Sequence, residues 1–219
     1  MKIIKPSYEI RTPFGPLTAT AGRRMLRFIE EMARISHRSE DRITAESYDR
    51  FLRTIILGHG DWSVVEHATV TVVFRVDRGI THELVRHRLF SFTQESTRFV
   101  NYGKRDMEFI HPAQAPNNFT EWERVMKECE KTYIELLSTG WRPQEARSIL
   151  PNALAATIAV TGNLRNWRHF LLMRTTLETH PDFRQVTVPL LDEFQKKIPI
   201  LYEDIEPNQR QANNLKKAR

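Results

Sequence analysis

The stretch RHRLFSFTQESTRF, residues 86–99, gathers positive charge, hydroxyl groups and aromatic rings within a few positions. Its basic and hydroxyl-bearing side chains are Arg86, His87, Arg88, Ser91, Ser96 and Arg98, with phenylalanines at 90, 92 and 99 between them. Such a set suits an anionic ligand with a flat ring, or a nucleic-acid strand held by stacking. A solvated helix end, where cations complement the helix dipole, would look similar.

The composition of the whole chain is that of a folded protein with a basic surface. Its 219 residues are enough for a sizeable core in one domain, and 40% of them are hydrophobic and 27% charged. The formal net charge of +6 favours polyanions, nucleotides or other phosphorylated ligands without choosing among them. The start, MKIIKPSYEI, lacks the apolar run of a signal peptide, and no long apolar segment follows. We therefore expect a cytoplasmic protein with no membrane partner.

Cys129 is the only cysteine, so neither an intrachain disulfide nor a cysteine-based metal cluster is expected. It stands among apolar residues at helical spacing, which predicts a buried structural thiol rather than a nucleophile. His59, Glu66 and His67 do not have the His-Glu-x-x-His spacing of a helical zinc site, so no metal is expected.

Hydrophobic periodicity predicts a mixture of helices and strands. The predicted helices cover residues 22–36, 45–57, 119–138, 164–175 and 183–197, with shorter ones opening at Gly79 and Pro143. The predicted strands cover residues 68–76, 107–112 and 154–162. The helix from Gly79 would carry Arg86–Arg88 at its C-terminal end, and Asn163 would cap the helix that follows it.

These elements follow no regular βαβ order, and the eight glycines form neither a dinucleotide fingerprint nor a phosphate loop. We predict a single mixed α+β domain over residues 1–219, with a central, largely antiparallel sheet flanked by helices and no Rossmann fold. Residues 203–219 are expected to form a polar, frayed tail.

Two arginines need an explanation beyond solubility. Arg174 shares a predicted helix face with Asn163, Trp167 and Phe170. A guanidinium on an apolar face is costly unless it is paired or faces a ligand, so both explanations stay open for Arg174. For Arg147 a solvated helix face is the default. A second hypothesis is that the arginines at 86, 88, 98, 147 and 174 converge on one anion, because guanidinium groups suit phosphate and carboxylate.

The spacing Arg-His-Arg-x-x-Ser-x(4)-Ser-x-Arg, complete from Arg86 to Arg98, resembles the signature of the flavin-dependent thymidylate synthases. HGDWSVVEH (59–67), ARSILPNA (146–153) and GNLRNWRHFLLMR (162–174) are similar to further segments of that family. The resemblance implies conversion of dUMP to dTMP, with methylenetetrahydrofolate as one-carbon donor, NADPH as reductant through FAD, and tetrahydrofolate as product. It also implies a homotetramer whose active sites are shared between subunits.

Site residues follow from the same resemblance. Arg174, which would polarise the uracil ring, and Ser96 are the implied catalytic residues. The implied dUMP contacts are Glu83, Arg86, Gln94, Glu95, Ser96, Thr97, Arg98, Arg147 and Arg174. The implied FAD contacts are Ser63, Arg86, His87, Arg88, Gln94, Asn163, Arg165 and His169.

The chain departs from the family pattern at a few positions. Thr93 stands where Asn is usual, Phe99 where Tyr is usual, Asp61 where many relatives have His, and Glu83 where Gln is usual. At these positions the resemblance does not predict which side chains contact the folate and the flavin. The competing hypothesis is a basic module that binds single-stranded nucleic acid by stacking on its phenylalanines; the synthase hypothesis expects no nucleic-acid partner.

Overall fold

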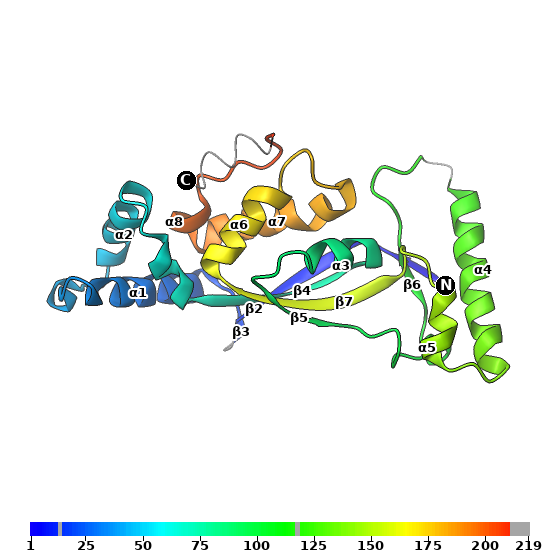
Figure 1. Ribbon diagram of the computed structural model, residues 1–219. Helices are drawn as coiled ribbons and strands as arrows, with labels where there is room; N and C mark the ends of the chain where they lie inside the picture. The colour runs from blue at the N-terminus through cyan, green and yellow to red at the C-terminus, as the bar shows by residue number, and fades with distance from the viewer. Residues whose placement is uncertain (13–14, 117–118, 211–219) are drawn as a thin grey trace. The chain divides into compact units, whose positions relative to one another are not determined.

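The computed structural model describes residues 1–12, 15–116 and 119–210 (Figure 1). Contacts within the chain divide it into two compact units. Unit 1 comprises residues 1–8, 73–88 and 92–160. Unit 2 comprises residues 9–72, 89–91 and those from 161 onward.

The main sheet is antiparallel and has five strands. In spatial order these are β3 (Gly15–Pro16), β2 (Ser7–Thr12), β4 (Thr69–Asp77), β7 (Ala155–Asn163) and β5 (Ser91–Gln94). A second, parallel pair joins β1 (Lys2–Ile4) to β6 (Glu108–Ile110). Buried and half-exposed residues alternate along β4 and β7, as in strands with one covered face. This architecture confirms the predicted α+β fold with a largely antiparallel sheet.

Unit 1 carries α3 (Arg78–Leu84), α4 (Thr120–Ser138) and α5 (Pro143–Ala146). Its core cluster consists of Tyr102, Met107, Phe109, Met126, Tyr133, Ala146 and Leu154. Pro143 occupies the first turn of α5, as predicted, where its missing N–H costs nothing. The helix predicted from Gly79 is shorter than expected: α3 ends at Leu84, and the His87 N–H donates to the Leu84 carbonyl at 3.0 Å. Arg86–Arg88 therefore lie in the turn after the helix.

Unit 2 carries most of the other helices. They are α1 (Ala19–Ile35), α2 (Ser47–Leu52) with a π-helical turn (Arg53–Gly58) after it, α6 (Leu164–Arg174), α7 (Pro181–Lys197) and α8 (Pro199–Tyr202). The Asn163 side chain caps α6 as predicted, accepting from the Asn166 N–H at 2.8 Å. Gly22 lets α1 approach the end of α7, since a Cβ there would lie 1.8 Å from the Lys197 carbonyl oxygen.

Aromatic side chains fill the core of unit 2. The Trp167 ring lies 4.7 Å from Phe90, 5.4 Å from Phe170 and 5.9 Å from Phe194, all edge-on. The Trp167 indole N–H also donates to the Val70 carbonyl at 3.0 Å, which ties α6 to β4. The core therefore fixes both the position and the rotation of α6.

The expectation of a frayed tail is wrong for residues 203–210. The Asp204 carboxylate accepts two hydrogen bonds from Arg168, at 2.7 and 2.6 Å, and Ile205 is buried. The Asn208 N–H donates to the Thr175 carbonyl at 2.8 Å. Residues 203–210 are therefore held against the rest of unit 2 by ion pairs and backbone hydrogen bonds. Residues 211–219 lie outside the described part of the chain. In the described ranges, no helix combines the length and apolar character needed to cross a membrane.

Candidate functional site

A cavity of about 560 Å³ in unit 2 gathers several of the predicted cofactor residues. It is lined by Trp62, Glu66, Leu89, Asn163, Arg165, Asn166, Arg168, His169 and Leu172. Five of these follow one another at short spacing along α6, and Asn163 caps that helix. The structure therefore brings Asn163, Arg165 and His169 together, as the resemblance implies.

The residues of α6 that line the cavity lie on a different face of the helix from Trp167 and Phe170. Trp167 and Phe170 are fully buried in the aromatic core, so the middle of the predicted stripe faces inward, while Asn163 at its start lines the cavity. Arg174 does not line the cavity; it is half-buried, with its guanidinium carbon 5.4 Å from the centre of the Phe183 ring. Arg174 therefore does not share this cavity with Asn163, and its contact with the nucleotide stays a prediction.

Two arginines at the cavity have different surroundings. Arg165 is half-exposed and its Nη1 donates to the Glu66 carboxylate at 2.5 Å. Arg168 is buried, is held by Asp204 and by the Leu201 carbonyl at 2.7 Å, and lies 4.3 Å from the Trp62 ring. Arg165 is thus the more accessible cation for a ligand, whereas Arg168 holds the wall together.

Ser63 lines a different cavity from Asn163, Arg165 and His169. It belongs to the 3₁₀-helix η3 (Trp62–His67), whose Trp62 and Glu66 line the large cavity. Ser63 itself lines a smaller cavity of about 260 Å³, together with His37 and Asp61. Asp61, one of the departures from the family pattern, therefore neighbours Ser63 and not Asn163.

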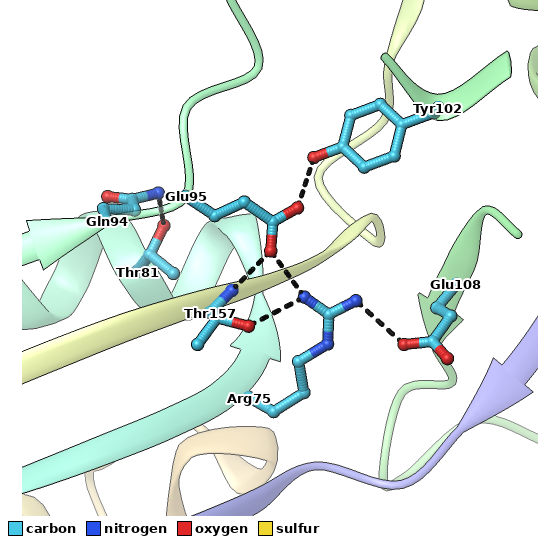
Figure 2. A network of polar contacts seen from close by, with 7 residues as sticks. All are labelled: Arg75, Thr81, Gln94, Glu95, Tyr102, Glu108 and Thr157. Atoms are coloured by element: carbon cyan, nitrogen blue, oxygen red, sulfur yellow. Dashed lines mark hydrogen bonds and ion pairs between the residues drawn. The ribbon is translucent and has the colours of Figure 1, made fainter. Parts of the chain in front are cut away.

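The second group of predicted residues lies in unit 1, around the end of β5. Figure 2 shows the Glu95 side chain directed toward Arg75 and Tyr102, and Gln94 beside Thr81. The Gln94 side-chain amide donates to the Thr81 hydroxyl at 3.0 Å. Arg147 reaches the buried Thr97 through a long hydrogen bond of 3.4 Å. The structure therefore joins Arg147 to the segment that follows β5.

The predicted ligand-binding arginines of unit 1 are open to solvent. Arg86, Arg88, Arg98 and Arg147 are exposed, while Glu83, His87 and Ser96 are half-buried. Within unit 1, guanidinium groups are thus accessible to an anion. Arg174 belongs to unit 2, and the convergence of all five arginines stays a prediction.

The phenylalanines do not form one stacking surface. Phe90 is packed in the core against Trp167, Phe92 is half-buried, and only Phe99 of these three is exposed, at 80%. The Arg98 guanidinium lies 5.6 Å from the centre of the Phe99 ring. A platform for successive bases would need several exposed rings, so this arrangement disfavours the nucleic-acid-binding hypothesis.

Sequence reasoning missed three residues that donate to Glu95, which are Arg75, Tyr102 and Thr157, and it missed Glu108, which Arg75 joins to them (Figure 2). The Arg75 guanidinium holds the pKa of the Glu108 carboxyl below its usual value. Burial, reinforced by the hydrogen bond to Glu95, raises the pKa of Tyr102 well above its usual range. The available signal was an arginine inside the apolar strand TVTVVFRVD.

Cys129 is half-buried rather than fully buried, in a shallow groove beside Val125 and Ile149. Burial raises the pKa of its thiol, which opposes thiolate formation. Across residues 1–12, 15–116 and 119–210, no group of three or more His, Cys, Asp or Glu side chains is placed to hold a metal ion.

Residues 20–200 match the family model described as "Thymidylate synthase complementing protein". The chain belongs to the flavin-dependent thymidylate synthase family. The family's member from Thermococcus onnurineus is 37% identical over 147 residues, which are 64% of this chain and 60% of the relative. The member from Pyrococcus furiosus is 34% identical over 178 residues, or 78% of this chain and 70% of the relative. The chain thus spans about three fifths to seven tenths of these relatives.

The fold is similar to a crystal structure described as "a UMP/dUMP methylase PolB from Streptomyces cacaoi bound with 5-Br dUMP". The TM-score is 0.73 at 21% identity, over 93% of this chain and 96% of the other. At that identity the likeness concerns the fold. Membership of the flavin-dependent thymidylate synthase family implies a flavin cofactor and favours an enzyme over a nucleic-acid-binding module.

Proposed function

We propose that the protein catalyses the reductive methylation of dUMP to dTMP. Methylenetetrahydrofolate donates the one-carbon unit, NADPH supplies the reducing equivalents through FAD, and tetrahydrofolate is released. The observation that carries this proposal is the family match over residues 20–200, within which the signature from Arg86 to Arg98 is complete.

The cavity of unit 2 fits a flavin. Trp62, Leu89 and Leu172 offer apolar surface to a flat ring, and Asn163 and His169 offer polar groups to its edge. Arg165, half-exposed, offers a cation to a phosphate. FAD, when bound, supplies redox chemistry for which protein side chains are unsuited. In this proposal Arg86, His87, Arg88 and Gln94 complete the FAD contacts, and Ser63 takes part through its neighbouring cavity.

The nucleotide is assigned to the residues around β5. Arg86, Arg98 and Arg147 are exposed guanidinium groups suited to the phosphate of dUMP, and Ser96 supplies a hydroxyl just before Arg98 in the sequence. Glu83, Gln94, Glu95 and Thr97 belong to the same proposed site. Arg174 activates the uracil ring by stabilising negative charge that develops on its carbonyl oxygens.

The proposal treats the two units as parts of one domain, because a single family model extends across both of them. It further includes a homotetramer with shared active sites, and a cytoplasmic location where nucleotide and folate substrates are present. These points rest on the family resemblance.

Genetic complementation tests the proposal. The chain is expressed in a bacterial strain that lacks thymidylate synthase and requires thymidine. We expect growth without thymidine for the wild-type chain and none for Arg174→Ala. Absence of growth with a folded, well-expressed wild-type chain would count against the synthase function.

A further inference from the structure

We propose that Arg75 is a positioning residue for nucleotide binding, acting through Glu95 on the backbone that carries Ser96, Thr97 and Arg98. The inference rests on the proposed function, in which those three residues contact dUMP. Arg75, Tyr102 and Thr157 thereby gain a role in nucleotide binding. Glu95 then supports the nucleotide through its backbone and not through its carboxylate.

Both carboxylate oxygens of Glu95 are used inside the protein (Figure 2). Oε1 accepts from the Tyr102 hydroxyl at 2.6 Å. Oε2 accepts from Arg75 Nη1 at 2.8 Å and from the Thr157 N–H at 3.2 Å. The Glu95 side chain is only 18% exposed. An ionised carboxylate with three donors around it is already satisfied, so its contribution to the ligand comes through its backbone.

Glu95 closes the loop that contains the proposed phosphate-binding residues. Its side chain meets Tyr102, and its own N–H donates to the Thr157 carbonyl at 2.8 Å, which fixes the loop's start against β7. Inside the loop, the Ser96 carbonyl accepts from the Phe99 and Val100 N–H groups at 3.1 and 2.9 Å. The conformation of residues 96–98 thus depends on the Glu95–Tyr102 closure.

Arg75 connects this closure to the sheet. Its Nη1 also donates to the Thr157 hydroxyl at 3.1 Å, and its Nη2 donates to Glu108 at 2.8 Å. One planar guanidinium therefore bridges two carboxylates, Glu95 from the β5 side and Glu108 from β6. Lys2, with its Nζ 3.4 Å from Glu108 Oε1, adds a second positive charge to the group. A lysine at position 75 would keep the charge but would lose the two-armed geometry.

The primary test replaces Arg75 with lysine and measures steady-state kinetics of the FAD-loaded enzyme. We expect the KM for dUMP to rise about 10- to 100-fold, because losing one charge-assisted hydrogen bond weakens binding by about that factor. Flavin content should stay at the wild-type value, because Arg75 does not line the cavity of unit 2 that is assigned to the flavin. A defect confined to nucleotide positioning should leave the KM for methylenetetrahydrofolate unchanged. The matched control is Arg124→Lys, which alters an exposed arginine–glutamate pair on α4 and should change none of these values.

Two further variants separate positioning from general destabilisation. Tyr102→Phe keeps the buried ring and removes only the hydroxyl donor, so it should raise the KM for dUMP by a smaller factor. Glu95→Gln combined with Arg75→Lys should be little worse than the more damaging single variant, because both changes act on one contact. Additive effects, or equal increases in the KM values for dUMP and folate, would overturn the proposal.

Hydrogen exchange tests, without any substrate, whether Arg75 and Glu95 hold the backbone of residues 96–100 in place. In Arg75→Lys, the amides of residues 96–100 should exchange faster than in the wild-type protein, while those of α6 keep their rates. If the wild-type protein makes no dTMP but Arg75→Lys still speeds exchange, the synthase function is refuted. The positioning of residues 96–100 by Arg75 is then still supported. If both the exchange rates and the KM for dUMP are unchanged in Arg75→Lys, Arg75 does not position these residues.

Discussion

At the scale of single residues, Arg174 carries the most specific chemical claim. It ends α6, half-buried against Phe183, and does not line the cavity assigned to the flavin. We expect Arg174→Ala to lower the rate of dTMP synthesis about 100- to 1000-fold, since it removes a donor that acts on developing charge. Bound flavin should stay near the wild-type amount. The measurement is NADPH-dependent dTMP formation alongside the flavin absorbance of each purified variant.

Arg174→Lys serves as the companion variant. It should rescue little activity, because an ammonium group cannot reproduce a planar pair of donors. Near-wild-type synthesis by the alanine variant would show that another arginine activates the ring, with Arg147 or Arg98 as the next candidates.

Cys129 bears on the mechanism through its thiol pKa, which burial raises. Cys129→Ser should therefore keep most of its turnover and lose about 1 kcal/mol of unfolding free energy, because a hydroxyl replaces a half-buried thiol. Urea denaturation and the dTMP assay check both parts. A folded variant that still binds FAD and dUMP but makes no dTMP would indicate a thiolate mechanism instead.

At the scale of elements, the segment after α8 holds the wall of the cavity assigned to the flavin. Asp204→Asn should lower the free energy of unfolding by about 2–4 kcal/mol, because Arg168 is only 4% exposed and loses the carboxylate that neutralises it. FAD affinity should fall as well, since Arg168 and its neighbour Trp62 both line the cavity. Thermal unfolding and a flavin titration measure the two effects.

Asp192→Asn is the control for that change, because Asp192 pairs with Lys196 on the exposed side of α7. Its effect on stability should be within about 0.5 kcal/mol. Equal effects of the two substitutions would mean that the Asp204–Arg168 pair contributes no more than a surface ion pair.

Helices could be predicted from the sequence because their apolar residues recur with the helical period, as in α1, α4 and α7. The long strands β4 and β7 could be predicted from their β-branched residues. By contrast, β5 is short (Ser91–Gln94) and none of its residues is fully buried, so it has no apolar pattern of its own. It forms a strand because it pairs with β7. β1 and β2 lie on either side of Pro6 and carry charged residues, so their local pattern was weak.

The candidate site was predictable to a similar extent. The signature spacing placed the residues around β5, and the cap at Asn163 located the start of α6. The missed residues act through tertiary contacts: Arg75 reaches Glu95 from a strand 20 positions earlier, and Arg168 reaches Asp204 from 36 positions away. Separations of that kind leave no periodic trace in the sequence. Arg75 is therefore visible only after the sheet brings its partners together.

At the scale of the whole molecule, we expect an obligate homotetramer of 25.8 kDa chains. Family resemblance implies active sites shared between subunits, so dissociation should abolish dTMP synthesis. Light scattering across a dilution series, combined with activity at each concentration, measures both quantities. A fully active monomer would contradict shared sites while leaving the proposed reaction intact.

The central claim is that the protein makes dTMP by a flavin-dependent route. The most direct measurement quantifies dTMP and the folate product per NADPH consumed by the purified protein, with and without added FAD, after bound flavin has been removed. The account predicts one dTMP and one tetrahydrofolate per NADPH, formed only when FAD is present. Dihydrofolate as the folate product, or dTMP formation that persists without flavin, would contradict it.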